Sequence, residues 1–294
     1  AGGLSTGFEM AGFETVLGIE HVEVFSKTFK TNHPDAELIC EDIREISVKD
    51  IKEIIGDVKI SIVCGGPPCQ GFSGAGRRDP ADPRNSLFMD FVRIVKGIQP
   101  EYFVMENVPG ILTMKTEKGK MVTEIIKSEF KKIGYDMKFE KLLAADYGVP
   151  QKRRRVIFIG SKKRTIIYPP PTHAEEPYDT LEGKRIHKWI GTKTALIPRN
   201  KIPKQYFHSS KMIEGFKKRK EENRKKGKGF GWQIIDPEKP CYTISARYWK
   251  DGADALVKYS ETEIRMLTER EAASIQTFPK DYIFEGSKKE FYMQ

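Results

Sequence analysis

One cysteine stands in a glycine- and proline-rich loop, the setting that best suits covalent chemistry. Cys69 follows an apolar run over residues 58–64 and lies within the sequence GGPPCQGFSGAG at 65–76. At the carboxyl end of a strand and close to a helix amino terminus, the nucleophilic thiolate form of a cysteine is favoured. Glycines on both sides permit a movable loop. We therefore interpret Cys69 as the candidate nucleophile, and Cys64, inside the strand, as a buried structural residue.

A carboxylate and a basic run follow two later apolar segments. Glu106 lies near the end of the run over residues 102–108, where three roles are open to it: a general acid, an acceptor for the edge of a base, or a helix-capping charge. In the sequence QKRRR, strand alternation places Gln151, Arg153 and Arg155 on one face. Lys152 and Arg154 then lie on the other face. The run suits either a solvated sheet edge or a site that binds a carbonyl or anionic oxygen on one face and phosphate on the other.

Two carboxylates near the beginning of the chain are placed to bind a nucleotide-like ligand. Glu20 and Asp42 come at the ends of strands expected at 15–20 and 38–43, where nucleotide-binding folds hold ribose hydroxyls. The chain also starts with Ala1-Gly2-Gly3 before a helical pattern, and such a glycine turn lets a ligand approach the backbone closely. The alternative interpretation is that both acids are ordinary charges at helix amino termini.

The elements that must position these residues alternate along the first 160 residues. Apolar strands are expected at 15–20, 38–43, 58–64, 102–108 and 155–160, and helices at 4–13, 22–31, 48–55, 86–98 and 118–133. This alternation predicts an α/β fold with a doubly wound, mostly parallel sheet. Prolines and a lysine-rich run at 217–228 indicate a smaller, irregular domain after residue 162. Thr268 and Glu271 form the capping box of a helix expected at 268–277.

The net charge of the chain comes from one internal block. The formal charge is +10, with 51 Lys and Arg against 41 Asp and Glu. Residues 1–160 hold 23 basic and 23 acidic side chains, residues 161–250 hold 22 and 9, and residues 251–294 hold 6 and 9. A clustered basic surface is typical of proteins that bind nucleic acid. The alternative is a solvated, lysine-rich insertion.

Several other classes of protein are disfavoured by the same sequence. No apolar run approaches the ~20 residues that span a bilayer, and no charged and then apolar leader opens the chain, so we expect a soluble, intracellular protein with no membrane partner. The four cysteines have neither the spacing of a disulfide framework nor a CxxC pair. We therefore expect reduced thiols and no metal site.

Three short motifs stand in a fixed order along the chain. They are Pro68-Cys69-Gln70, Glu106-Asn107-Val108 and Gln151-x-Arg153-x-Arg155, with the basic block after them. In this order they resemble the DNA (cytosine-5)-methyltransferase family of prokaryotic restriction–modification type, and the resemblance extends over nearly the whole chain. The segment RMLTEREAASIQTFP at 265–279 is similar to the family segment that follows the recognition domain. The fold that the resemblance implies is that of S-adenosylmethionine-dependent methyltransferases, with a smaller, irregular target-recognition domain.

The resemblance implies methyl transfer from S-adenosyl-L-methionine to C5 of a cytosine flipped out of duplex DNA. Cys69 would add to C6, Glu106 would bond the N3 edge, and Arg153 with Arg155 would stabilise the ring carbonyl, which makes these four the expected catalytic residues. The expected cofactor-binding residues are Ala1, Gly2, Gly3, Glu20, His21, Asp42, Ile43, Pro68 and Leu87. The expected DNA- and target-binding residues are Gln70, Ser73, Gln151, Arg154, Thr243 and Arg247.

The resemblance also divides the chain into functional parts. We expect a catalytic and cofactor-binding domain at 1–163, a target-recognition domain at 164–256, and a C-terminal segment at 257–294 that returns to the catalytic domain.

The first cofactor strand of the family would precede Ala1 and its Gly-Asn-x-Val-Pro motif would follow Gln294, so a few residues are expected to be missing at each end. We expect a monomer in the prokaryotic cytoplasm, associated with the nucleoid when bound to its partner duplex DNA, and with a cognate restriction endonuclease that acts on the same site.

Three other functions compete with this interpretation. A tRNA cytosine-5 methyltransferase shares the fold, motifs and mechanism, but the long basic insertion and the sequence GFS at 71–73 favour DNA. A non-catalytic DNA-binding subunit would bind DNA with salt-sensitive affinity and transfer no methyl group. A cysteine hydrolase is disfavoured, because none of the five histidines stands in a motif beside Cys69.

Overall fold

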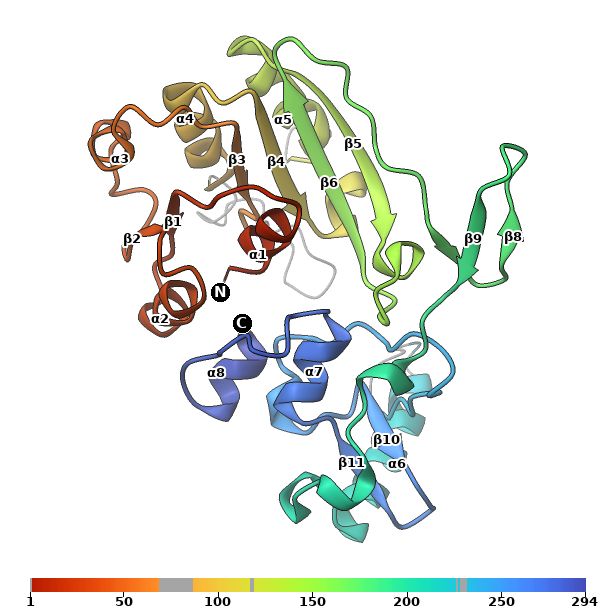
Figure 1. Ribbon diagram of the computed structural model, residues 1–294. Coiled ribbons are helices and arrows are strands. Elements are labelled where there is room, and N and C mark those ends of the chain that lie inside the picture. The colour runs from red at the N-terminus through yellow and green to blue at the C-terminus, as the bar shows by residue number, and fades with distance from the viewer. Residues whose placement is uncertain (1, 69–86, 117–118, 226, 228–231) are drawn as a thin grey trace. The chain divides into compact units, whose positions relative to one another are not determined.

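The computed structural model describes residues 2–68, 87–116, 119–225, 227 and 232–294. The chain divides into two compact units (Figure 1). The first comprises Ala1–Leu142 and Arg154–Pro170, and the second comprises Leu143–Arg153 and Pro171–Gln294. The boundaries expected from the sequence at 163/164 and 256/257 concern functional domains and stay predictions.

Helices and strands alternate along most of the first unit. In chain order they are α1 (Gly3–Met10), β1 (Leu17–Ile19), α2 (Glu23–Asn32), β2 (Glu37–Ile39), α3 (Val48–Ile55), β3 (Ile62–Gly65), α4 (Leu87–Ile98), β4 (Tyr102–Asn107), the 3-10 helix η3 (Pro109–Thr113), α5 (Val122–Lys132), β5 (Asp136–Leu143) and β6 (Arg154–Ser161). Every strand and helix expected in this region forms, and the differences lie at their ends. α3 has the expected bounds, because Ser47 and Asp50 form a capping box at its beginning.

The strands of the first unit form two sheets. β1 pairs with β2 in parallel, and four further strands form a sheet in the order β3-β4-β6-β5. In the larger sheet β3 and β4 are parallel, whereas β4 and β6 are antiparallel. β5 was not expected from the sequence. The larger sheet is therefore mixed, and a doubly wound arrangement of the whole unit stays a prediction.

Aromatic side chains fill the core between the four-stranded sheet and helices α4 and α5. Phe103 of β4 stacks on Phe130 of α5 with ring centroids 3.7 Å apart, and Phe91 of α4 contacts both rings edge-on. Opposite Phe103 in β6 is Gly160, where an added Cβ atom would lie 1.9 Å from the Phe103 ring. The glycine therefore makes room for the ring at the centre of the β4–β6 pairing.

The second unit is built from short elements. They are η4 (Ala144–Tyr147), β7 (His173–Ala174), β8 (Tyr178–Asp179), β9 (Arg185–Lys188), α6 (Ser210–Lys225), η8 (Tyr248–Lys250), β10 (Leu256–Lys258), β11 (Ile264–Met266), α7 (Glu269–Ile275) and α8 (Lys288–Met293), with further single-turn 3-10 helices. β7, β9 and β8 form one sheet, and β10 pairs with β11 in antiparallel. Within the described ranges of both units, every helix is too short or too polar to cross a membrane.

A fully buried ion pair organises the end of the second unit. Arg265 and Glu271 are both 0% exposed, and the guanidinium donates from Nη1 and Nη2 to the two carboxylate oxygens at 2.7 and 2.8 Å. Glu271 also accepts the backbone N–H groups of Thr268 and Ile197. The capping box of Thr268 and Glu271 is thereby confirmed. Because both carboxylate oxygens are fully used, one side chain joins β11, α7 and the chain at Ile197.

Replacing Gly160 by alanine is expected to lower the free energy of unfolding by about 1–3 kcal/mol, because the added methyl group overlaps the Phe103 ring. Urea unfolding followed by circular dichroism measures the change. The control is Gly7→Ala in α1 of the same unit, where no atom lies within 4 Å of the added Cβ. This control should leave stability unchanged or raise it by roughly 0.5–1 kcal/mol. Equal stability of the two variants would mean that Gly160 does not govern the β4–β6 packing.

Candidate active site

Glu106 lies at the carboxyl end of β4. The side chains of this strand alternate, and Phe103, Met105 and Asn107 are buried in the core. Glu106 belongs to the other face, and its side chain is 26% exposed. A half-buried carboxylate at the end of a strand is held in place by the sheet and is still open to a ligand.

Arg155 reaches Glu106 because β6 runs antiparallel to β4. In this register Asn107 lies opposite Val156 and Glu106 lies opposite Ile157, so the beginning of β6 meets the end of β4. The Nε atom of Arg155 lies 2.5 Å from Oε1 of Glu106. Both side chains are mostly shielded from water, which strengthens their attraction, although the Nε–H group of Arg155 is not aligned for a hydrogen bond to the carboxylate.

The chain that leads to Cys69 passes beside Glu106. The Nδ2 group of Asn107 donates to the carbonyl oxygen of Pro67 at 3.1 Å. A Cβ atom at Gly66 would lie 3.5 Å from Oε2 of Glu106, so this glycine lets the backbone approach the carboxylate. The sequence analysis treated Asn107 only as part of a motif. The sequence did hold a signal for this contact. Asn107 is a polar residue at a core-facing position of a strand, and a buried amide needs a hydrogen-bond partner.

The expected residues Cys69, Gln70 and Ser73 lie outside the described residues. Two other cysteines are poor nucleophiles: burial raises the pKa of the Cys64 thiol to about 11 and that of Cys241 to about 12. Both therefore remain protonated at neutral pH, which supports the interpretation of Cys64 as a structural residue. Across the described ranges, no three His, Cys, Asp or Glu side chains gather as a metal site would require.

Glu20 follows β1 at the edge where a nucleotide-like ligand was expected. Ile19 lies opposite Ile39 in the parallel β1–β2 pair, so the chain leaves both strands at the same edge. Oε1 of Glu20 accepts the Val22 N–H at 3.0 Å and lies 3.3 Å from Nδ1 of His21. Since a carboxylate has roughly four lone-pair sites, Glu20 retains capacity to accept hydroxyl hydrogen bonds.

Asp42 and Ile43 lie farther from a strand end than expected. β2 ends at Ile39, so the strand expected at 38–43 is too long, and both residues belong to the loop before α3. Hydrogen bonds from the Arg44 guanidinium, 2.9 and 2.6 Å long, hold the Asp42 carboxylate and lower its pKa well below the usual value. The Ile43 carbonyl accepts from Arg93 at 2.7 Å. Asp42 is therefore charged at neutral pH and firmly oriented.

The other expected cofactor residues surround helix amino termini. Gly2 precedes α1 with a φ of 89°, a left-handed conformation that favours glycine. Gly3 is the first residue of α1, Leu87 is the first residue of α4, and Pro68 is exposed. Ala1 lies outside the described residues. A glycine turn before one helix and a carboxylate after the next strand offer the N–H donors and the acceptor that a nucleoside ligand needs.

The second unit contains Gln151 and Thr243. Gln151 is fully buried and forms a parallel bridge with Cys241. Neither Oε1 nor Nε2 of its amide has a hydrogen-bond partner among the described residues. The Thr243 hydroxyl donates to the Lys152 carbonyl at 2.9 Å. These bonds hold the chain at 150–152 against the chain at 241–243.

The basic run follows the expected alternation only in part. Arg155 is half-buried and Arg154 is exposed, but Lys152, expected on the same face as Arg154, is half-buried like Arg153, because both residues precede β6. Arg155 joins Glu106 within the first unit, while Arg153 belongs to the second. Arg247 is exposed directly before η8.

The chain as a whole is similar to one protein family. The C-5 cytosine-specific DNA methylase model matches residues 1–294. The Type II methyltransferase M.DdeI of Desulfomicrobium norvegicum is 37% identical, with 98% of this chain and 78% of that protein covered. The Type II methyltransferase M1.HphI of Haemophilus parahaemolyticus is 36% identical, again with 98% of this chain and 78% of that protein covered.

Solved structures share the fold at lower identity. A mutant of Spodoptera frugiperda DNMT2 has a TM-score of 0.73 at 19% identity and covers 99% of this chain and 91% of its own. The S. pombe Dnmt2 methyltransferase has a TM-score of 0.72 at 17% identity and covers 99% and 89%. The full-length family match and the relatives above 30% identity confirm what the ordered motifs predict: the chain belongs to the C-5 cytosine-specific DNA methylases, and is a DNA (cytosine-5-)-methyltransferase.

Proposed function

We propose that this enzyme methylates C5 of a cytosine flipped out of a specific duplex DNA sequence, through a covalent bond between Cys69 and C6. The supporting observation is the Glu106–Arg155 ion pair, 2.5 Å between Nε and Oε1, beside the loop at Gly66. Cys69 follows Gly66 by three residues in the sequence. A thiol, a carboxylate and a guanidinium are the three groups that activation of a cytosine ring needs.

The chemistry begins with the ring, because cytosine is a weak carbon nucleophile. Attack of the Cys69 thiolate on C6 forms a C–S bond and moves an electron pair toward C5. Glu106 bonds the exocyclic amine and the N3 edge, where a proton neutralises the developing charge, and Arg155 with Arg153 stabilises the ring carbonyl. After C5 has accepted the methyl group, water takes up the C5 proton, and the electron pair of the broken C–H bond expels the Cys69 thiolate. Return of the N3 proton to Glu106 then restores the neutral aromatic ring.

The methyl donor in this proposal is S-adenosyl-L-methionine, which supplies an electrophilic methyl group when bound. We assign its ribose to the Glu20 carboxylate, which follows β1 and has lone pairs to spare beside its bond to the Val22 N–H. The glycine turn at Gly2 would admit the ligand close to the backbone of α1. The other residues assigned to this site are Ala1, Gly3, His21, Asp42, Ile43, Pro68 and Leu87.

DNA recognition is assigned to the basic part of the chain. In this proposal residues 164–256 form the target-recognition domain, 1–163 the catalytic domain, and 257–294 a segment that serves the catalytic domain. The residues assigned to DNA contact are Gln70, Ser73, Arg154, Thr243 and Arg247. Gln151, expected among them, is fully buried and does not reach DNA in this conformation. The parallel pairs β1–β2 and β3–β4 support a doubly wound sheet as the scaffold. In this proposal the enzyme is a monomer of the prokaryotic cytoplasm. The Type II names of the relatives support its pairing with a cognate endonuclease.

Replacing Cys69 by alanine is expected to abolish methyl transfer while most DNA affinity survives, because the thiol supplies chemistry and the basic residues supply affinity. Methyl transfer is measured by the incorporation of labelled methyl groups into duplex DNA, and DNA affinity is measured by a gel-shift titration. The control is Cys40→Ala, since Cys40 is an exposed free cysteine that the proposed mechanism does not use.

Retained turnover by the C69A protein would contradict the covalent mechanism. The same assay decides the acceptor, because labelling of tRNA alone would overturn the choice of DNA. Bisulfite sequencing of a plasmid exposed to the wild-type enzyme then gives the modified base and the recognised sequence.

Replacing Glu106 by glutamine is expected to lower kcat by roughly 10²–10⁴-fold, because the amide cannot donate or accept the proton at N3. DNA affinity should change only a few-fold, because glutamine keeps the shape of the side chain. Single-turnover methylation measures the loss. Glu101→Gln is the matched control: Glu101 precedes the same strand and makes an exposed ion pair with Lys59. Equal single-turnover rates for the E106Q and E101Q proteins would remove Glu106 from the mechanism.

A further inference from the structure

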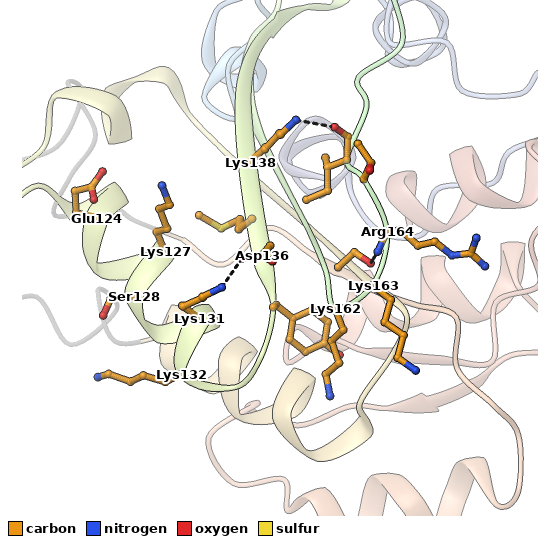
Figure 2. A pocket seen from close by; sticks show the side chains of 15 residues that line it. Glu124, Lys127, Ser128, Lys131, Lys132, Asp136, Lys138, Lys162, Lys163 and Arg164 are labelled. Carbon is orange, nitrogen blue, oxygen red and sulfur yellow. Dashed lines mark hydrogen bonds and ion pairs between the residues drawn. The ribbon is translucent and has the colours of Figure 1, made fainter.

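A second charged site lies in the first unit, away from Glu106. Helix α5, the beginning of β5 and the chain at 161–166 line a cavity of about 1120 Å³, shown in Figure 2. Seven of the lining side chains are basic and two are acidic. We name this cavity the lysine groove. No residue assigned to methyl transfer or to the cofactor lines it.

The β4–β6 register separates the lysine groove from the active site. Ser161, which lines the groove, pairs with Tyr102 at the beginning of β4, whereas Arg155 pairs with Glu106 near its end. Ser161 lies six positions after Arg155 along β6, which corresponds to about 20 Å at ~3.4 Å per residue. A base held at Glu106 therefore does not occupy the groove.

The spacing of polar residues in α5 directs one face of this helix to the groove. Lys127, Ser128 and Lys131 line the groove at helical intervals of three and four, while Ile126 and Phe130 are buried on the opposite face. Cations in the last turn of a helix are common, because they complement the helix dipole. That effect accounts for Lys131 and Lys132 but not for the basic residues on β5 or at 162–164.

Part of the positive charge is already bound within the groove. Lys131 pairs with Asp136 at 2.7 Å, and Lys138 donates to the Ile166 carbonyl at 3.1 Å. The Lys162 ammonium lies 5.1 Å from the centroid of the Tyr135 ring. These contacts hold the groove wall in a defined shape.

Three further cations have no such compensation. Lys127, Lys163 and Arg164 are exposed, and no acidic side chain in the described part of the chain pairs with them. They come from two different segments that line the same groove. Like charges without acidic partners along one open surface repel each other, so a bound polyanion would stabilise this arrangement.

We propose that the lysine groove binds the phosphate backbone of duplex DNA, at a segment other than the one that carries the target cytosine. Six of its seven basic residues are lysines, mobile point charges that suit a run of phosphates better than one fixed anion. The hydroxyls of Ser128 and Thr165 are further phosphate donors along the same surface.

The lining favours DNA over an acidic protein segment. A protein partner needs apolar anchors at the centre of its interface. The large apolar side chains of the groove, Tyr135, Met137 and Ile166, are between 0 and 8% exposed and so are covered by the protein itself. What the groove offers to a partner is charge and hydroxyls, which bind phosphates without reading sequence. The groove would add sequence-independent affinity while the enzyme searches for its site.

The test is the salt dependence of DNA binding. The triple variant Lys127→Gln, Lys163→Gln, Arg164→Gln removes the uncompensated cations and breaks none of the groove contacts described above. The control is Lys49→Gln, Lys52→Gln, Lys96→Gln, three exposed lysines of α3 and α4 whose loss changes the net charge equally. For a long duplex, the slope of log K against log salt should fall by about 2–3 in the groove variant and by less than about 1 in the control.

A second measurement uses the unmodified protein, so that misfolding of a variant cannot decide the result. Acetylation by an amine-reactive reagent, read by mass spectrometry, should be slower at Lys127 and Lys163 when duplex DNA is present, and unchanged at Lys49 and Lys52. Equal salt slopes for the two triple variants, or equal acetylation with and without DNA, would overturn the proposal. Groove-dependent binding of poly-glutamate without DNA binding would also overturn it, in favour of an acidic protein partner. Neither the salt slope nor the acetylation rate depends on methyl transfer. Failure of the proposed function would instead appear as a lack of turnover in the methylation assay.

Discussion

The antiparallel pairing of β4 with β6 is the constraint on which the candidate site depends. A slip of one residue in this pairing would turn every side chain of β6 to the other face, so that Arg154 would replace Arg155 on the side of Glu106. Phe103 over Gly160 resists such a slip, because only glycine leaves space for the ring at that position. The packing of Phe103 against Gly160 in the core therefore fixes the position of the Glu106–Arg155 ion pair at the end of β4.

The second unit has a different organiser. Its strands are short and α6 is rich in lysine, but it has an apolar core of its own, in which Tyr248, Leu267 and Ile275 are almost fully buried. The buried Arg265–Glu271 pair carries a desolvation penalty, which is offset only because every carboxylate oxygen is used by the guanidinium or a backbone N–H. Such a pair tolerates one geometry and excludes others. The pair therefore adds a directional constraint to the apolar core that surrounds it.

Local sequence predicts elements here better than it predicts their pairing. α3 and α7 begin where their capping boxes lie, since Ser47 and Thr268 bond their own helices and need no distant contact. β5 was missed although charged and apolar residues alternate strictly from Asp136 to Glu140, which is the pattern of a strand with one exposed face. The meeting of Arg155 with Glu106 depends on the direction of β6, for which the 48 residues between them hold no local signal. The ordered motifs identified the family, while the role of Asn107 in holding the Pro67 carbonyl needed coordinates.

Charge summed along the chain and charge summed over a surface lead to different conclusions. Residues 1–160 have no net charge, yet Lys127 and Lys138 of that segment line one groove together with Lys162, Lys163 and Arg164. Only two of the 23 acids of that segment line the groove, and several others are engaged locally, as Asp42 is by Arg44. Folding has therefore separated charges that the sequence interleaves. A basic block at 161–250 predicts one nucleic-acid surface. The neutrality of residues 1–160 is no argument against a second surface, because a phosphate responds to the cations within a Debye length and not to the total charge of a segment.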